Sequence, residues 1–155
     1  MRAVKTQGNV VRFPEVKPVS IVPVLPDSLD DAIPIALELL RPAFKRQAMN
    51  VSEEYLVKDL RDGQSVLWMV YLGDTLTAAF TTAVITHPLR SVLKVEFLGG
   101  YDMHEWVDGA IKFLADVAKH AGLAAIEADG RPGFEKMVKG LPFRPVYTNY
   151  VMELS

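Results

Sequence analysis

The feature that most constrains this chain is a run of three apolar segments joined by short turns. Two dipeptides, Gly73-Asp74 and His87-Pro88, interrupt the run, and such pairs mark turns between neighbouring strands. The first segment carries apolar side chains on both faces, as a strand in the middle of a sheet does. The pattern predicts three consecutive strands: Ser65–Leu72, Thr75–Thr86 and Ser91–Leu98.

Two helices are predicted ahead of these strands. Ser28 and Ser52 are suitable N-caps, because a serine hydroxyl accepts a hydrogen bond from a free backbone N–H of the first helical turn. Pro34 and Pro42 lie inside the first helical pattern, and a proline removes one helical hydrogen bond. We therefore expect the first helix to be broken into two short pieces.

A longer helix is predicted after the strands. Asp102–Glu105 has the pattern of a capping box, in which two side chains bond the free N–H groups of a helix start. Gly122 then marks the end of this helix. The other predicted elements are a first strand, Val19–Leu25, a strand at Leu123–Ala128, a short helix around Phe134–Val138 and a last strand, Tyr147–Leu154.

The N-terminal segment differs from the rest of the chain in composition. The first 26 residues hold four prolines, which block helices and remove donors from a strand ladder. Residues 1–20 also carry four basic side chains against a single glutamate. We expect residues 1–18 to form an extended Pro-rich arm and residues 19–155 to form one domain, with the arm packing on this body or on a neighbouring subunit.

Composition excludes several classes of function. A formal net charge of −2 provides no basic field for a phosphate backbone, so we expect no nucleic-acid partner. The chain has no cysteine, which excludes disulfides, thiolate metal sites and cysteine nucleophiles. Its three histidines lack the spacing of metal ligands, and no metal is expected. We expect no signal peptide, because Met1–Lys5 leads into no apolar segment, and no membrane span, because no apolar run approaches about 18 residues.

The predicted order of elements is strand, two helices, three strands, helix, strand, helix, strand, which is an α/β (α+β) architecture. This order resembles the GNAT acyltransferase fold. Two of the matching stretches are Phe97–Gly100, which is followed by Trp106, and the Gly-Arg-Pro-Gly-Phe element at 130–134. In these stretches the chain is most similar to GNAT-like proteins of tailed bacteriophages. The resemblance covers roughly Pro26 to Leu154 and implies a mixed central sheet with helices on both faces.

The resemblance also implies a place for a cofactor. GNAT enzymes hold the pyrophosphate of acyl-CoA in a Gln/Arg-x-x-Gly-x-Gly/Ala loop before the long helix, and Gly99, Gly100 and Tyr101 occupy this place here. The loop lacks Arg and Lys, however, and Asp102 and Glu105 put negative charge at the helix start. A carboxylate that caps these N–H groups competes with a phosphate, so we expect no cofactor.

Three further residues are site candidates by resemblance. Glu96 lies on the strand where GNAT enzymes often carry their general base, although it could instead face solvent or pair with Lys94 or Arg90. Tyr147 lies near the place of the tyrosine that protonates the leaving thiolate, although strand tyrosines more often serve packing. Arg131 would flank the acyl-CoA thioester in an active enzyme.

Two functions follow from this pattern. The main hypothesis is a phage-encoded GNAT-fold protein without catalysis, found in the virion or the host cytoplasm. It would be a virion structural or assembly protein, oligomeric, whose arm binds other virion proteins or a second copy. The alternative is an N-acetyltransferase that uses acetyl-CoA to modify a small amine or a host protein. A third possibility is an inactive domain that still binds CoA.

Overall fold

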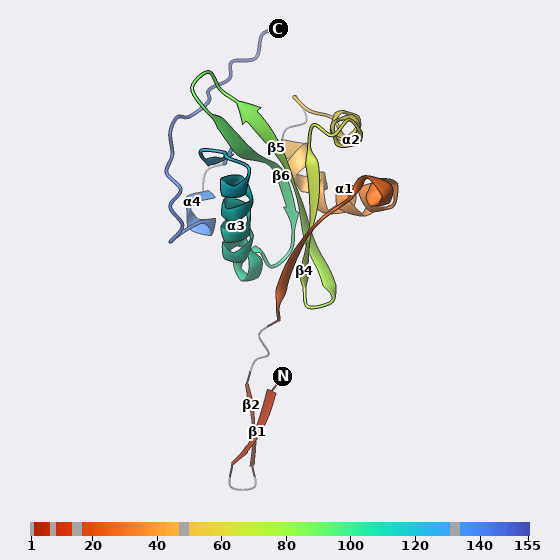
Figure 1. The fold of residues 1–155 in the computed structure, drawn as a ribbon, viewed down its shortest axis with the longest axis vertical. Helices are drawn as coiled ribbons and strands as arrows, with labels where there is room; N and C mark the ends of the chain where they lie inside the picture. The colour runs from red at the N-terminus through yellow and green to blue at the C-terminus, as the bar shows by residue number, and fades with distance from the viewer. Residues whose placement is uncertain (1, 7–8, 14–16, 47–49, 131–133) are drawn as a thin grey trace.

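A five-stranded sheet forms the centre of the molecule (Figure 1). The structure is a computed structural model that describes residues 2–6, 9–13, 17–46, 50–130 and 134–155. Neighbouring strands are antiparallel except for the last pair, which is parallel. The strands follow in spatial order: β3 (Val19–Pro23), β4 (Val66–Leu72), β5 (Thr75–Thr86), β6 (Ser91–Gly100) and β7 (Ile126–Ala128).

Helices cover both faces of this sheet, so the predicted α+β architecture is confirmed. On one face lie α1 (Leu29–Arg46), which follows the short 3-10 helix η1 (Pro26–Ser28), and α2 (Glu53–Arg61). On the other face lies α3 (Met103–His120), with the short α4 (Phe134–Met137) beside it (Figure 1). Each face has its own buried apolar cluster.

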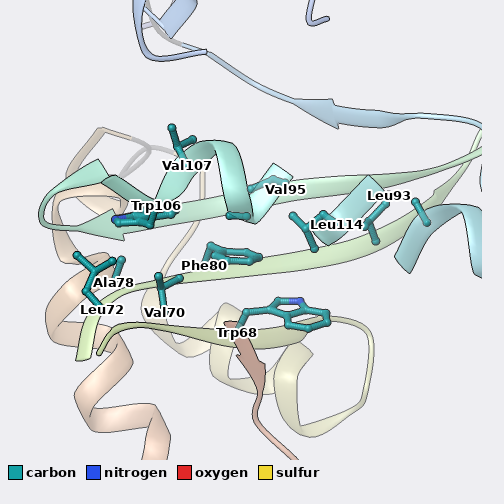
Figure 2. Close-up of a cluster of buried hydrophobic side chains, with 12 residues drawn as sticks. Trp68, Val70, Leu72, Ala78, Phe80, Leu93, Val95, Trp106, Val107 and Leu114 are labelled. Atoms are coloured by element: carbon teal, nitrogen blue, oxygen red, sulfur yellow. The ribbon is translucent and has the colours of Figure 1, made fainter. Parts of the chain in front are cut away.

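Aromatic side chains anchor both clusters. Under α3, Trp68 stacks on Phe80 with ring centroids 6.1 Å apart, and Trp106 and Leu114 pack over them (Figure 2). The indole N–H of Trp68 donates to the Thr82 hydroxyl at 2.9 Å, which satisfies the polar end of a buried ring. Burial of this kind supplies most of the stability of such a sheet.

Helix α1 is continuous, so the predicted break at its prolines is wrong. Pro34 and Pro42 are eight residues apart and both lie on the exposed side of the helix. The carbonyls that lose a partner belong to Asp30 and Glu38, which are also exposed and can be hydrated by water. Packing of the opposite face against the sheet therefore keeps the helix intact.

The start of α3 also differs from the prediction. Asp102 occupies the N-cap position, but its side chain makes no capping hydrogen bond, so the capping box does not form. Its backbone lies in the left-handed region at φ 52° and ψ 39°, and its carbonyl accepts the Glu105 N–H at 2.9 Å. The end of α3 is as predicted, because Gly122 at φ 73° follows the C-cap residue.

The last predicted strand is absent among the described residues. Tyr147–Leu154 has no regular structure, and its apolar side chains are exposed. Alternation predicts a strand only where an edge is available for pairing, and β7 offers three residues. At the other end of the chain, β1 (Arg2–Thr6) and β2 (Asn9–Phe13) form an antiparallel hairpin within the segment expected to be an extended arm.

Candidate active site

The candidate site lies where β7 ends and β6 continues. The last pair between these parallel strands is Val95 with Ala128, whereas β6 runs on to Gly100. In the described part of the chain, residues 97–100 of β6 therefore pair with β5 alone. A free strand edge beyond the carboxyl end of a parallel pair is a common place for ligands in sheets with helices on both faces.

A β-bulge in β6 places Glu96 at this position. Val95 pairs with Thr82 and Phe97 pairs with Thr81, so Glu96 has no partner residue on β5. The extra residue reverses the alternation of side chains. Val95 packs in the cluster under α3, but Phe97 stacks on Phe44 of α1, with ring centroids 4.7 Å apart.

Glu96 lines a cleft of about 150 Å³ on the α2 side of the sheet. Its carboxylate accepts a hydrogen bond from the hydroxyl of Ser65, which is buried, at 2.8 Å. The predicted pairing with Lys94 or Arg90 is not formed, because Lys94 binds Asp129 instead, with Nζ and Oδ2 2.9 Å apart. The cleft is lined by Val51, Tyr55, Leu56, Asp59, Lys94, Glu96, Phe97 and Asp129.

Lys94 connects Glu96 electrostatically with Tyr147. Burial lowers the pKa of Lys94, but the hydrogen bond and charge of Asp129, together with Glu96 and Tyr147, outweigh burial and raise the pKa above its ordinary value. Both predicted catalytic residues thus lie within electrostatic range of one ammonium group. Tyr147 is 81% exposed and belongs to the irregular C-terminal segment rather than to a strand.

Sequence reasoning missed the other polar groups of the cleft. Asp129 follows directly after the strand predicted at Leu123–Ala128, and its position at a strand end could have identified it. Tyr55 and Asp59 lie four residues apart on α2, so they share a face of that helix. No local signal in the sequence marks this face as part of a site, because the sequence does not show that α2 lies next to β6.

Packing explains both glycines of the loop that follows. A Cβ on Gly99 would overlap the Leu39 carbonyl of α1 and lie 3.2 Å from the Cα of Leu40. A Cβ on Gly100, where φ is +140°, would lie 2.5 Å from the Cα of Ala78. These two residues let β6 approach α1 and β5 closely.

The loop between β6 and α3 presents backbone donors. Tyr101 is held by its own N–H, which donates to the Thr77 carbonyl at 3.0 Å, and by its carbonyl, which accepts the Trp106 indole N–H at 2.8 Å. The Met103 and His104 N–H groups have no acceptor among the described residues. A left-handed residue before a helical one turns successive N–H groups toward one side, which suits an anion. The expected competition from a capping Asp102 side chain is absent.

The element around Arg131 is described only at its ends. Arg131 itself lies outside the described residues, so the structure does not place this predicted cofactor contact. Gly130 packs under Phe134, because a Cβ there would lie 2.7 Å from the ring. Phe134 in turn meets Phe143 edge to face, with centroids 6.1 Å apart.

The histidines have other roles within the described residues. His87 lies 2.9 Å from a Glu127 carboxylate oxygen, and His120 lies 2.8 Å from the Asp116 carbonyl oxygen. No group of three or more potential ligands there could hold a metal ion. Across that same part of the chain, every helix is too short or too polar to span a membrane.

No protein-family model matches the chain, and no curated protein matches it either. Solved structures do. The chain has the GNAT acyltransferase fold. It superposes on a probable acetyltransferase with a TM-score of 0.65 at 16% identity, which covers 88% of this chain and 98% of that one.

Two further structures with the GNAT fold are similar over most of their length. A ribosomal-protein-alanine N-acetyltransferase from Brucella melitensis biovar Abortus 2308 has a TM-score of 0.62 at 15% identity, covering 89% of this chain and all of that one. A predicted acetyltransferase from Clostridium acetobutylicum, solved with acetyl-CoA, has a TM-score of 0.58 at 14% identity, covering 89% and 96%. At these identities the likeness establishes the fold alone.

Proposed function

We propose that this chain is an N-acyltransferase that uses acetyl-CoA to acetylate an amine bound beside Glu96. The observation that carries the proposal is the bulge at Glu96, which puts a carboxylate into a cleft at the free edge of β6. All three GNAT-fold structures compared above are described as acetyltransferases, one of them with acetyl-CoA. The phage-virion hypothesis has no comparable structural support.

The residues present fit acetyl-CoA. The N–H groups of Met103 and His104, free of a capping carboxylate, can bind a pyrophosphate at the start of α3. The unpaired edge of residues 96–100 can hydrogen-bond an extended chain that carries amide groups, as an added strand would. Residues 98–106 contain neither Lys nor Arg to support the phosphate charge.

Acetyl-CoA supplies an acetyl group activated as a thioester. Glu96 accepts a proton from the substrate ammonium, and Ser65 keeps its carboxylate oriented. Transfer of the acetyl group would form the nitrogen–carbon bond of an amide and break the carbon–sulfur bond, and a backbone N–H of the bulged edge would stabilise the carbonyl oxygen as it gains charge. Of the two protons that the ammonium loses, the first would pass through Glu96 to water and the second would go to water as the nitrogen–carbon bond forms. Tyr147 would give its proton to the thiolate and take one back from water, so the products are an amide, a thiol and one released proton.

A thermal melt with acetyl-CoA, followed by a turnover assay, tests this proposal. Ligand at about 100 times its dissociation constant stabilises the chain by roughly 2.7 kcal/mol. For a domain of this size we expect the melting temperature to rise by about 5–10 °C. Turnover with an amine should fall about 10²–10⁴-fold in Glu96→Gln while the thermal shift persists. Loss of both effects in the variant would point to a folding defect.

The second candidate is a non-catalytic GNAT-fold protein, the phage virion protein of the sequence hypothesis. The observation in its favour is the acidic start of α3, where Asp102 and Glu105 oppose a phosphate. Absence of any thermal shift up to millimolar acetyl-CoA, with no turnover, would favour it over the acyltransferase. Pull-down with virion proteins would then test it directly.

A further inference from the structure

The cleft beside Glu96 carries an excess of negative charge. Three carboxylates and one ammonium group line it, and the ammonium of Lys94 is already bound to Asp129. Glu96 accepts one hydrogen bond, from Ser65. The Asp59 carboxylate has no ion pair or hydrogen bond in the described part of the chain, although its backbone carbonyl accepts the N–H groups of Gln64 and Ser65.

Three cations of the neighbouring helices are held in ion pairs outside the cleft. Lys58, next to Asp59 in sequence, binds Asp62 at 2.6 Å, and the hydrogen bond with Asp62 is the main reason that its pKa is raised. The other two basic side chains of α1 and α2 with described ion pairs also bind acids outside the cleft: Arg61 binds Asp30 at 3.2 Å, and Arg41 binds Glu53 at 3.3 Å. Two carboxylates of the cleft, those of Asp59 and Glu96, thus remain to bind positive charge from a ligand.

The walls between these carboxylates are apolar. Val51, Leu56 and Phe97 line the cleft, and Leu56 and Phe97 are buried. Such walls suit a methylene chain and do not suit a hydrated metal ion. Complementarity therefore calls for a molecule with cationic ends and an aliphatic middle.

The volume of the cleft, about 150 Å³, indicates how much of that molecule the cleft holds. A cavity of about 150 Å³ in another protein holds a benzene molecule, which has six heavy atoms. Pockets for drug-sized ligands are about 300–1,000 Å³. Four methylene groups between two nitrogens also make six heavy atoms, so the volume of the cleft matches a short linear diamine.

We infer that the acceptor is a short aliphatic diamine, with its reacting nitrogen at Glu96 and its distal ammonium bound by Asp59. The assignment rests on the proposed function and names Asp59 as the residue that determines specificity. Asp59 touches the end of the substrate that does not react, so its loss should weaken binding without slowing the chemical step.

The turnover assay compares butane-1,4-diamine with butylamine on the full chain. Free CoA can be followed with a thiol reagent without background, because the protein has no cysteine. We expect a kcat/KM at least tenfold higher for the diamine. Asp59→Asn should raise the KM for the diamine about tenfold, leave kcat within twofold, and leave butylamine unaffected. Asp108→Asn is the matched control and should change neither constant, because Asp108 is an exposed residue of α3, which covers the opposite face of the sheet from the cleft.

Binding without turnover separates this inference from the proposed function. Calorimetry with butane-1,4-diamine alone should show binding to the wild-type chain and about tenfold weaker binding to Asp59→Asn. If the diamine binds in this way but no acetyl group is transferred, the cation site stands and the acyltransferase proposal fails. If both amines are acetylated equally and Asp59→Asn changes neither kcat nor KM, the diamine assignment is overturned and the acyltransferase proposal stands. A lysine peptide that outperforms the diamine tenfold would also overturn it.

Discussion

The substitution Gly99→Ala tests the contact that fixes α1 against β6. The added Cβ would overlap the Leu39 carbonyl and lie 3.0 Å from its carbonyl carbon. Both atoms belong to the backbone of a helix, so no flexible side chain can yield. Relief requires α1 to shift as a body, which disturbs fully buried Leu40 and the Phe44–Phe97 stack.

Forcing an extra methyl group into a well-packed core costs about 1–3 kcal/mol. At about 2–4 °C per kcal/mol, the melting temperature of Gly99→Ala should fall by about 2–12 °C. Gly109→Ala is the matched control, because this glycine lies inside α3 with nothing within 4 Å of its Cβ position. Alanine is the better helix former, so the control should gain about 0.5–1 kcal/mol. Scanning calorimetry of both variants gives shifts of opposite sign.

The same variant distinguishes packing from cofactor binding as the role of Gly99. If Gly99 served only to admit a pyrophosphate, Gly99→Ala would melt like the wild-type chain and lose its response to acetyl-CoA. A Gly99→Ala chain as stable as the wild type would refute the close approach of α1 to β6 described here. If Gly99→Ala is destabilised but its melting temperature still rises with acetyl-CoA, the role of Gly99 is packing and not cofactor binding.

Three other predictions address charge and the C-terminal segment. Asp102→Asn and Glu105→Gln should each tighten acetyl-CoA binding roughly two- to five-fold, because each removes a negative charge from the start of α3. Calorimetry at low salt measures this change in affinity. Unchanged affinity would show that the phosphates bind elsewhere. Lys94 has a raised pKa in the folded state, so its ion pair contributes stability below about pH 10.5 that is lost as pH rises through the folded pKa. Melting curves between pH 8 and 11.5 should show this loss, below about 1 kcal/mol, in the wild type and not in Lys94→Met. Truncation after Pro145 should change the melting temperature by less than about 2 °C, because the side chains it removes are exposed. It should nevertheless lower turnover as much as Tyr147→Phe does. Full activity of the truncated chain would exclude Tyr147 as the acid.

Most of the sheet could be predicted from sequence because its signals are local. The turns at Gly73 and at His87-Pro88 and the two-sided apolar pattern each act within a few residues, and the observed strands β4, β5 and β6 agree with the predicted ones to within two residues. The closing strand was predicted from alternation alone. A strand also needs a partner edge, which is a property of the assembled sheet.

The candidate site shows a different limit. Leu93, Val95 and Phe97 alternate with polar residues, so they read as one face of a regular strand. The bulge at Glu96 moves Phe97 to the other face, and the regular alternation conceals it. The hydroxyl that binds Glu96 comes from Ser65, 31 residues earlier, and only the pairing of β4, β5 and β6 brings the two together.

The acidic start of α3 counts less against acyl-CoA than the sequence suggested. Two effects were expected there: a carboxylate occupying the N–H donors, and repulsion between that carboxylate and a phosphate. The structure removes the first, because Asp102 makes no side-chain cap. The second is about 0.3–1 kcal/mol for each exposed charge and is screened by salt. Hydrogen bonds from two N–H groups to a charged phosphate contribute about 1.5–3 kcal/mol each. A phosphate at the free donors of Met103 and His104 would therefore gain more from them than it would lose to repulsion from Asp102 and Glu105.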